Sequence, residues 1–378
     1  MLSQFDSTPD RSEFWSFKWQ KYAGREDIIP CWVADTEYQC AAPILEALRK
    51  QTDYGVLGYS LPAQHEPANT AVQRWLKDKH DWTVNSDWIV WNPGVVPAFN
   101  VAIKAYAKAG DKVLVQSPNY PPLLAAPGLN QCERVDIPTI LEGERWTIDF
   151  DALETAAADP ACSLMILCNP MNPVGSVMSQ AEIDKISDIC VRHNVALCSD
   201  EIHCDLILDE HAKHIPAGRV EQLAERSVTL MAASKTFNVA GLGTSFAIIP
   251  DATMRRQFIQ AAAGIVPWAN VMGLVATAAA FTRCDDWLAE QITYLRSNRD
   301  YLIERINAID GLRVVPSAAT FLAWVDASGL GVSDVQKWCE ERGVGPSPGR
   351  DFGAPAFFRI NFGCSRAMLT DILDRLSQ

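Results

Sequence analysis

Short apolar runs alternate with longer amphipathic stretches over residues 88–250, and this alternation predicts the architecture of the central part of the chain. Six runs have the length of a strand and are almost uninterrupted in apolar character, as expected of strands buried on both faces of a sheet. They cover residues 88–91, 112–116, 164–168, 195–199, 228–233 and 245–249. Helical periodicity separates them, which predicts an α/β fold with a mostly parallel central sheet flanked by helices.

Two of the intervening helices carry recognisable end signals. Apolar residues recur at three- and four-residue spacing over residues 95–108, and Gly110 is expected to end that helix. Ser179 and Glu182 have the spacing of a capping box, which predicts a helix that begins there and runs to His193.

The alternation fades after about Pro250, which suggests a second unit. The C-terminal third begins as a long helical region and continues with strand-like runs, which predicts a smaller α+β domain. The first forty-odd residues have few periodic signals and are interpreted as an arm that packs on this unit or on a partner subunit. The predicted division is 1–45 for the arm with part of the small domain, 46–275 for the large domain, and 276–378 for the small C-terminal domain.

Composition and charge narrow the classes of protein to consider. Hydrophobic residues make up 48% of the 378 residues and charged residues 21%, which is typical of globular proteins. The net charge of -13 disfavours binding to nucleic acid or to an anionic membrane. Eleven cysteines, an odd number without any CxxC pair, favour reduced thiols in a cytoplasmic protein.

Two segments test the prediction of a cytoplasmic protein. The N-terminal residues MLSQFDSTPDRSEFW place acidic residues and an arginine before any apolar run, so we do not expect a secretory signal. Residues 257–282 contain no charge, but Pro267, Asn270 and two glycines interrupt them. We interpret the alanine-rich half of that stretch as a tightly packed helix inside a large domain or at a subunit contact, and we expect no membrane partner.

Polar residues follow the buried runs at the places where ligands bind in open α/β sheets, the carboxyl ends of strands. After the first run, a glycine turn feeds a helix whose free amides can hold a phosphate. Later runs are followed by an amide, a carboxylate and an amine. The residues concerned are Gly94, Val95 and Val96 in the glycine turn, then Asn172, Asp200 and Lys235.

Each of these groups also has an ordinary structural interpretation. Lys235 can be a lysine whose ammonium reaches solvent, Asp200 a helix cap, and Asn172 a turn former. Together they supply an amine, a carboxylate, an amide and a phosphate cradle. Pyridoxal phosphate needs that set, for its aldehyde, its pyridinium nitrogen and its phosphate.

Three ordered motifs resemble the fold-type I pyridoxal-phosphate enzymes of the aminotransferase class I/II superfamily. They are Asn-Pro-x-Asn-Pro-x-Gly at 169–175, Ser-Asp-Glu-Ile-His at 199–203 and Ala-Ser-Lys-Thr-Phe-Asn at 233–238. Within that superfamily the chain is most similar to the cystathionine β-lyase group of MalY/PatB type. Supporting segments run from Pro-Cys-Trp-Val-Ala-Asp at 30–35 to Arg-Ile-Asn-Phe-Gly at 359–363, so the resemblance covers nearly the whole chain.

The resemblance implies roles around the cofactor ring. Lys235 would hold pyridoxal 5'-phosphate covalently and, once released by substrate, move the Cα proton. Asp200 would pair with the pyridine nitrogen, and Asn172 would bind the phenolic oxygen or the substrate carboxylate. Tyr120 would stack on the ring face, to which an aromatic plane is suited.

The resemblance also implies how the phosphate and the substrate are held. The amides of Gly94, Val95 and Val96 would bind the phosphate, and Ser234 would add a hydroxyl. Tyr59 would reach phosphate and substrate from the neighbouring subunit, which implies a homodimer with shared active sites.

Arg359 would bind the substrate α-carboxylate through its guanidinium fork. It lies in an apolar run at 357–362, where alternation places Arg359 and Asn361 on one face. The alternative interpretation is an exposed strand arginine.

Two positions depart from the usual aminotransferase pattern. His203 stands where a tyrosine usually contacts the phenolic oxygen, and we expect it among the cofactor-binding residues. Gly243 stands where a phosphate-binding arginine is usual, and both changes favour the lyase group. Thr36, Glu37 and Tyr38 differ from the Met-Asp-Phe expected in that group, which leaves the preferred substrate side chain open.

The sequence thus favours a carbon-sulfur β-lyase that releases a thiol, pyruvate and ammonia from a sulfur amino acid such as cystathionine. An aminotransferase and a pyridoxal-phosphate-binding regulatory protein remain as alternatives. A nicotinamide-dependent dehydrogenase is disfavoured, because no GxGxxG follows a strand. We expect no metal site, since Cys198, His203 and Cys204 lack the partners for four-coordination.

Overall fold

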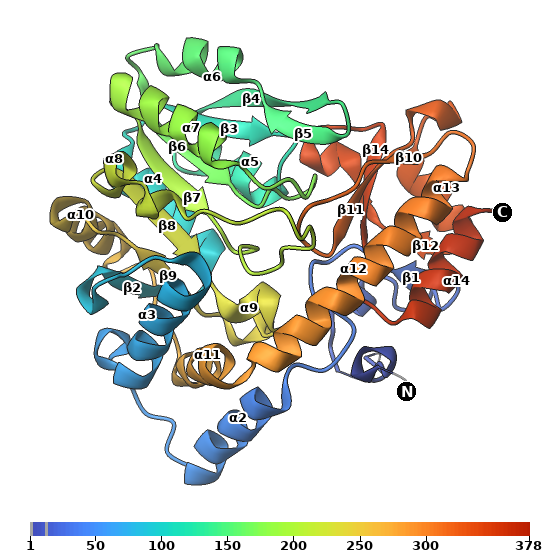
Figure 1. Cartoon of the computed structure of the whole chain (residues 1–378), viewed down its shortest axis with the longest axis horizontal. Coiled ribbons are helices and arrows are strands. Elements are labelled where there is room, and N and C mark those ends of the chain that lie inside the picture. Colours follow the sequence, from blue (N-terminus) through green and yellow to red (C-terminus); the bar gives the residue numbers. More distant parts are fainter. Residues whose placement is uncertain (1–2, 12–13) are drawn as a thin grey trace.

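The computed structural model describes residues 3–11 and 14–378, and it builds them around a large sheet and a small sheet (Figure 1). The large sheet has eight strands in the order β2-β9-β8-β7-β6-β3-β4-β5. Neighbours from β4 to β8 run parallel, while β5, β9 and β2 pair antiparallel. The strands are β2 (Ile89–Asn92), β3 (Lys112–Ser117), β4 (Glu133–Glu142), β5 (Arg145–Ile148), β6 (Cys162–Cys168), β7 (Ala196–Asp200), β8 (Ser227–Met231) and β9 (Ser245–Ile248). All six predicted runs are strands of this sheet, which confirms the predicted fold class.

Strands β4 and β5 were not predicted, and their position in the sheet explains why. They form the far edge of the sheet, and most side chains of β4 are exposed or half-buried. An edge strand of this kind has no continuous apolar run, so the pattern that identifies buried strands is missing.

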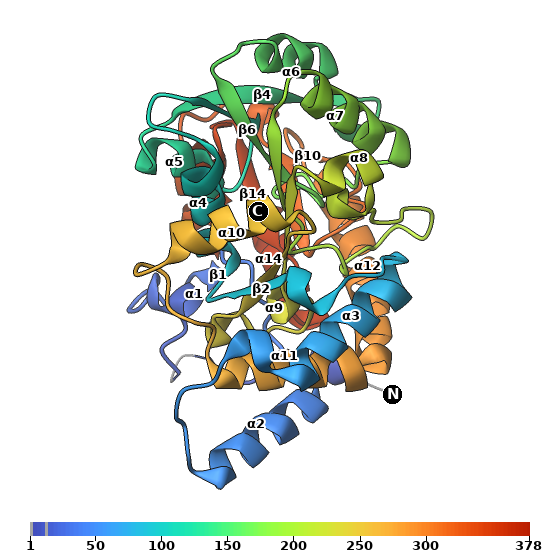
Figure 2. The same ribbon diagram turned by 90° about the vertical axis from the view of Figure 1, so that its left-hand side faces the viewer.

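Helices cover both faces of the large sheet, with α4 and α5 on one side and α7 and α8 on the other (Figure 2). The helices of this part are α2 (Ala42–Tyr54), α3 (Glu66–His80), α4 (Val95–Tyr106), α5 (Pro121–Leu129), α6 (Phe150–Ala157), α7 (Gln180–Arg192), α8 (Glu221–Ala224), α9 (Ala233–Thr236), α10 (Ala252–Ala262) and α11 (Val271–Arg283). Both helices predicted from end signals are present, and the capping box of Ser179 and Glu182 is formed.

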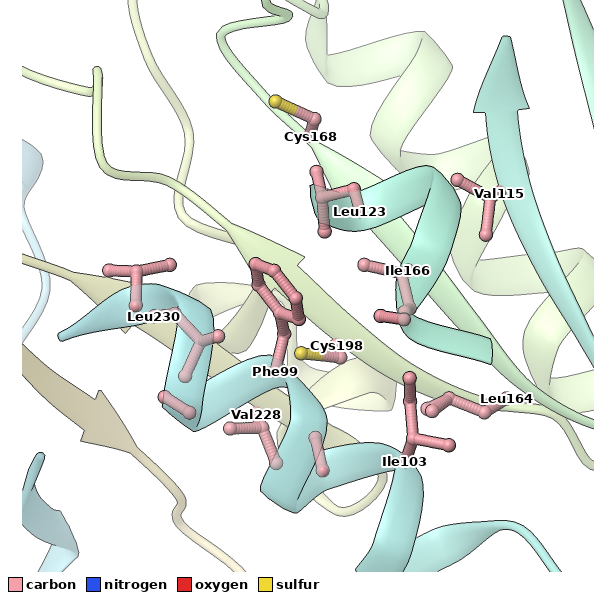
Figure 3. Packing of buried hydrophobic residues seen from close by; sticks show 14 of the residues in the cluster. Phe99, Ile103, Val115, Leu123, Leu164, Ile166, Cys168, Cys198, Val228 and Leu230 are labelled. Carbon is pink, nitrogen blue, oxygen red and sulfur yellow. The ribbon is translucent and has the colours of Figure 1, made fainter. Parts of the chain in front are cut away.

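Successive residues of the central strands point to opposite sides, so each strand feeds two cores. Leu164 and Ile166 share one core with Phe99 of α4 (Figure 3), whereas Met165 and Leu167 belong to the core on the other face, with helix α7. All five side chains are fully buried. Burial on both faces is the reason for the unbroken apolar runs in the sequence.

The small sheet carries the C-terminal part, with strand order β10-β11-β14-β13 and antiparallel pairing throughout. Its core lies under α12 (Asp285–Asn307), α13 (Val335–Glu341) and α14 (Arg366–Leu376). The strands are β10 (Arg313–Val314), β11 (Leu322–Asp326), β13 (Ser347–Pro348) and β14 (Phe357–Asn361). Short 3-10 turns occur at Gln4–Asp6, Pro62–Gln64, Ser86–Trp88, Ala217–Arg219, Ala240–Leu242, Ser328–Leu330 and Gly349–Phe352.

The N-terminal arm joins the small unit. After α1 (Phe17–Gln20), strand β1 (Ile29–Pro30) pairs in parallel with β12 (Val344–Gly345). Through this pairing the arm contacts the C-terminal unit. The positions at which one domain gives way to the next stay predictions.

The uncharged stretch 257–282 is divided between α10 and α11, with an irregular connection at 263–270. Helix α11 buries Leu274, Ala276 and Phe281 in a core shared with α2 and α3. Among the described residues, no helix has both the length and the apolar character needed to cross a membrane. The alanine-rich half of this stretch is therefore a packed helix, as interpreted from the sequence.

Candidate active site

The carboxyl ends of β6, β7 and β8 open into a cavity of about 490 Å³ between the two sheets. Residues after β2 and β3 and residues of the small sheet complete its wall. Ten of the eleven predicted site residues line it: Gly94, Val95, Val96, Tyr120, Asn172, Asp200, His203, Ser234, Lys235 and Arg359. The structure thus gathers groups that are spread over 266 positions of sequence, from Gly94 to Arg359.

Lys235 follows β8 on the short helix α9, and its Nζ donates a hydrogen bond to the carbonyl oxygen of Ala34 at 2.8 Å. Burial lowers the pKa of this lysine to about 8; Arg359 lowers it further, while Asp35 and Asp200 oppose the shift. A lysine with such a pKa is a neutral amine in a substantial fraction of molecules near pH 8. Lys235 can therefore act as a nucleophile or a base.

Asp200 ends β7 with 4% of its surface exposed. Among the described residues, the only hydrogen bond to its carboxylate comes from the amide of Ile202, at 3.1 Å. Burial raises the pKa of Asp200 to about 7, although that amide and the charge of Lys235 oppose the rise. A buried carboxylate with so little compensation is suited to a bound N–H cation, such as a protonated pyridine ring.

His203 is buried beside the cavity as a neutral imidazole. Burial, together with the nearby charges of Lys235 and Arg359, lowers its pKa to about 3. Its Nδ1 has no hydrogen-bond partner among the described residues. Buried polar atoms are rarely left unpaired, and His203 lines the cavity.

Arg359 is 4% exposed, so the interpretation as an exposed strand arginine is wrong. Its Nη1 donates to Asn172 Oδ1 at 2.8 Å, and its Nη2 donates to the carbonyl of Trp32 and to Ser347 Oγ. Burial lowers its pKa to about 10, and no carboxylate of the described residues pairs with it. The guanidinium can therefore receive an anionic group, and its Nε is unpartnered.

The start of helix α4 offers backbone amides to the cavity. Gly94 precedes the helix with a φ of 151°, a value that side chains disfavour. Val95 and Val96 occupy the first two helical positions, where amides have no partner within the helix, and the next residue is Pro97, which has no amide hydrogen. Free amides at the positive end of a twelve-residue helix suit a phosphate, and Ser234 lines the same cavity.

The two tyrosines of the predicted site lie in different places. Tyr120 lines the cavity as the cap of α5, and burial raises its pKa, which keeps the phenol protonated. Tyr59 is fully exposed in the irregular segment after α2 and does not line this cavity. A single chain therefore does not bring Tyr59 to the other site residues.

Sequence reasoning missed part of the cavity wall. Trp32, Val33 and Ala34 line it, and so do Lys21, Asp351 and Phe352. The first three belong to the segment 30–35, which carried the resemblance but was assigned no role in the site. Nothing in the local pattern indicated that their carbonyls would bind site residues.

The potential metal ligands that lie together in the structure are not the three that were considered in the sequence. Cys198, His203 and Cys204 do not form such a group in the described parts of the chain, whereas His80, Cys204 and Asp205 lie together. Asp205 accepts a hydrogen bond from Trp75 Nε1 at 3.0 Å, and its carboxylate lies 2.9 Å from His80 Nε2. These side chains thus satisfy one another as a hydrogen-bond network.

The chain is similar to known proteins in both sequence and fold. The family model described as aminotransferase class I and II matches residues 33–376. The chain is 36% identical to cystathionine beta-lyase PatB of Bacillus subtilis (strain 168) over 383 residues, covering 98% of both chains. The crystal structure of OvoB superposes with a TM-score of 0.95 at 40% identity, covering 99% of this chain and 98% of that one.

A further solved structure bears on the cofactor. Cystalysin from Treponema denticola, whose crystal structure contains pyridoxal 5'-phosphate, superposes with a TM-score of 0.93. It is 30% identical, and the match covers 100% of this chain and 98% of that one. The unpaired Asp200 carboxylate, the free amides of Val95 and Val96 and the partly buried Lys235 fit the three ends of this cofactor.

Proposed function

The chain belongs to the aminotransferase class I and II family, and on that premise we propose that it is a carbon-sulfur β-lyase acting on an amino acid with sulfur on Cβ. It is a pyridoxal-phosphate-dependent enzyme of the branch that includes carbon-sulfur lyases. The observation that carries the proposal is the full-length likeness, at 36% identity, to a cystathionine beta-lyase. The neutral His203 in the cavity wall supports it, because aminotransferases usually have a tyrosine there.

Pyridoxal phosphate, when bound, supplies an aldehyde for covalent attachment and a ring that withdraws electrons from Cα. Asp200 would hold the proton on the ring nitrogen, a role for which its buried and unpaired carboxylate is suited. The amides of Val95 and Val96 would bind the phosphate with Ser234, and Tyr120 would cover the ring face.

Substrate binding and proton transfer would fall to Arg359 and Lys235. Arg359 would bind the α-carboxylate, since no carboxylate of the described residues neutralises it. Lys235 would remove the Cα proton with its Nζ, after which the thiolate leaves Cβ. One water molecule is consumed overall, and the products are a thiol, pyruvate and ammonium.

The shared active site of a homodimer belongs to the same proposal. Tyr54, Val56, Leu57, Tyr59 and Leu61 are all exposed by half or more. They cluster at the end of α2 and in the segment after it, which lies at the lower edge of the molecule in Figures 1 and 2. An exposed apolar cluster of this kind is typical of a subunit contact, and there Tyr59 would enter the partner's cavity.

A hybrid dimer tests this arrangement. Lys235→Ala and Tyr59→Ala subunits are each expected to be inactive or weak as homodimers. When the two kinds of subunit are mixed, each hybrid dimer would have one fully native site. Both substitutions would fall in its other site, because Tyr59 enters the cavity of the partner. Recovery of about a quarter of wild-type activity supports the shared site, since half of the dimers would be hybrids with one working site each. No recovery in hybrids verified by mass would contradict it.

The reaction is tested by giving the purified enzyme L-cystathionine without any keto acid and measuring pyruvate and ammonia. Equal amounts of both, absent in Lys235→Ala, are the expected result. Conversion of amino acids to keto acids only when 2-oxoglutarate is added would favour an aminotransferase instead. If the cofactor-loaded protein does neither with any sulfur amino acid, the regulatory alternative is favoured.

The eleven cysteines are all unpaired. Free thiols in this number support the proposal that the enzyme works in the reducing cytoplasm.

A further inference from the structure

Residues 32–36, called here the 32–36 segment, connect the N-terminal arm to both sheets without regular secondary structure. Each of its five carbonyl oxygens accepts a hydrogen bond from a side chain elsewhere in the chain. The donors are Arg359 and Ser347 for Trp32, Asn361 for Val33, Lys235 for Ala34, Lys18 and Asn361 for Asp35, and Arg11 and Asn238 for Thr36.

Two of these donors, Arg359 and Lys235, are cations that line the candidate active site. Arg359 Nη2 lies 2.5 Å from the Trp32 oxygen, and Lys235 Nζ lies 2.8 Å from the Ala34 oxygen. The position of the 32–36 segment thus determines where both cations find an acceptor. A shift of this segment would move the lysine amine relative to its substrate.

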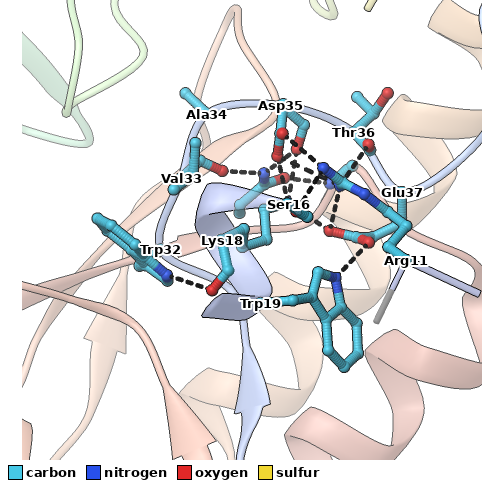
Figure 4. A network of polar contacts seen from close by, with 12 residues as sticks. Arg11, Ser16, Lys18, Trp19, Trp32, Val33, Ala34, Asp35, Thr36 and Glu37 are labelled. Atoms are coloured by element: carbon cyan, nitrogen blue, oxygen red, sulfur yellow. Dashed lines mark hydrogen bonds and ion pairs between the residues drawn. The ribbon is translucent and has the colours of Figure 1, made fainter. Parts of the chain in front are cut away.

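Four charged side chains, Arg11, Lys18, Asp35 and Glu37, form an ion cluster at this segment (Figure 4). Lys18 Nζ lies 2.8 Å from Asp35 Oδ1, contacts Glu37 Oε1, and donates to the Asp35 carbonyl at 2.7 Å. Arg11 pairs with Asp35 at 2.8 Å and with Glu37 at 3.1 Å. Two cations face two carboxylates, so the cluster is neutral.

Burial makes the centre of this cluster sensitive to change. The side chains of Lys18 and Glu37 are 1% and 4% exposed, whereas Arg11 and Asp35 at its rim are 20% and 23% exposed. Trp19 Nε1 also donates to Glu37 at 3.1 Å. A buried ammonium bound to two carboxylates and one carbonyl has little freedom, so it restricts the position of Asp35 and of the peptide bond that joins it to Ala34.

We propose that Lys18 is a positioning residue for Lys235: by binding Asp35 and Glu37 it fixes the Ala34 carbonyl that receives the Lys235 amine. The inference rests on the proposed function, because it concerns the step in which Lys235 transfers the Cα proton. That step is the interval in which Lys235 is a free amine that carries the Cα proton, and the Ala34 carbonyl is then its hydrogen-bond acceptor.

The test compares four variants with the wild-type enzyme. Lys18→Met removes the ammonium, and Lys18→Arg keeps a charge at the same place. Lys18→Met combined with Glu37→Gln removes one charge of each sign, so the cluster stays neutral and the variant remains informative if the single substitution does not fold. Arg25→Met is the matched control, because Arg25 forms an exposed ion pair with Asp27 on the same arm.

The readout is exchange of the Cα hydrogen of L-alanine with deuterium, followed by NMR over a range of pH. Alanine has no leaving group, so the exchange reports the base alone. We expect Lys18→Met and the double variant to load cofactor normally but to exchange about 10- to 100-fold more slowly, the cost of misplacing a catalytic group by about 1 Å. Lys18→Arg should recover most of the rate, and Arg25→Met should match wild type.

The pH dependence separates positioning from a merely structural role. Exchange should fall at low pH as Lys235 becomes protonated. The positive charge of Lys18 lowers the pKa of Lys235, while the other charges around it, Asp35, Asp200 and Arg359, are unchanged in Lys18→Met. The acidic limb of that variant should therefore move to higher pH.

Wild-type exchange rates and an unmoved limb in Lys18→Met would overturn the inference, and so would a wild-type rate in the double variant. The proposed function fails separately. If the wild-type enzyme exchanges the alanine hydrogen but releases no pyruvate from cystathionine, the lyase proposal is wrong. The role of Lys18 can then still be decided by the same exchange measurement. A wild-type enzyme that exchanges nothing overturns both.

Discussion

Two buried carboxylates of the large domain, Glu182 and Asp200, have opposite electrostatic surroundings. Glu182 stands in the first turn of α7 and accepts hydrogen bonds from Arg145, Thr147 and Ser179 at 2.6–2.8 Å. Burial raises its pKa, but these bonds outweigh burial and lower the pKa to about 2. Asp200 has one amide bond, and burial raises its pKa to about 7.

The difference separates a carboxylate that the fold itself satisfies from one to which the proposed function assigns a role. Other residues of the chain satisfy the hydrogen-bonding capacity of the Glu182 carboxylate. Its bond with Arg145 joins helix α7 to strand β5 across 37 residues of sequence. The chain leaves Asp200 with a single hydrogen bond, in the wall of a cavity that Lys235 also lines. An uncompensated buried charge costs stability and persists where a ligand supplies the missing partner.

The largest expected effect comes from Lys235→Ala, which removes the amine from the candidate active site. We expect turnover to fall by more than about 10⁴-fold, because one group supplies both covalent attachment and the base. The visible absorbance of the bound cofactor should disappear as well. Normal absorbance in this variant would mean that another amine holds the cofactor.

Asp200→Asn should lower kcat by about 10³-fold, since a neutral amide does not hold the proton on the cofactor ring. The measurement is kcat on L-cystathionine with saturating cofactor. Folding should survive, because the amide removes a desolvated charge. A variant that keeps wild-type kcat would show that Asp200 is a structural carboxylate like Glu182.

The pH dependence of unfolding should have opposite signs for the two carboxylates. The folded pKa of Asp200 lies above its usual 3.8, so in the cofactor-free protein its ionisation costs stability as pH rises from about 4 to 7. The cost amounts to at most about 4 kcal/mol and is constant above pH 7. Urea unfolding of wild type and Asp200→Asn should diverge over that interval, and bound cofactor should reduce the divergence. Parallel curves would contradict the raised pKa.

Arg359→Lys keeps the charge but loses the guanidinium fork that binds Asn172 and Trp32. We expect KM for the amino acid to rise by about 10- to 100-fold with a smaller change in kcat, because a bidentate contact with the carboxylate is lost. Steady-state kinetics measures both constants. An unchanged KM would place the carboxylate contact elsewhere.

Glu182→Gln should have the smallest effect and should confine it to stability. Its folded pKa lies below the usual 4.5, so the carboxylate stabilises the protein above that pH, and the gain is lost as pH falls toward 2. At pH 7 we expect a loss of about 1–2 kcal/mol in unfolding free energy with kcat within about twofold of wild type. Reduced kcat without reduced stability would contradict the assignment of Glu182 as structural.

Much of the fold could be predicted from the chain because the central strands are buried on both faces. Leu164–Cys168 is an example, since alternate residues enter different cores and none is free to be polar. The edge strands β4 and β5 escaped prediction because they lack that constraint. The site residues at strand ends were predicted for a topological reason, the shared carboxyl edge of parallel strands, and the cavity gathers them. Tyr120, Arg359 and Tyr59 were implied by the family resemblance instead, and of these three Tyr59 does not line the cavity. Their individual roles stay predictions.

The sequence by itself determined which chemical groups follow which strands, because apolar runs and the motifs after them are local features. Only the tertiary structure decided what each group experiences. Arg359 and Asn172 meet across 187 residues, and Lys18 meets Glu37 inside the arm with no motif to announce it. Protonation states depend on burial and on the partners that folding brings within a few ångströms, so the pKa values of Glu182 and Asp200 shift in opposite directions in the folded protein.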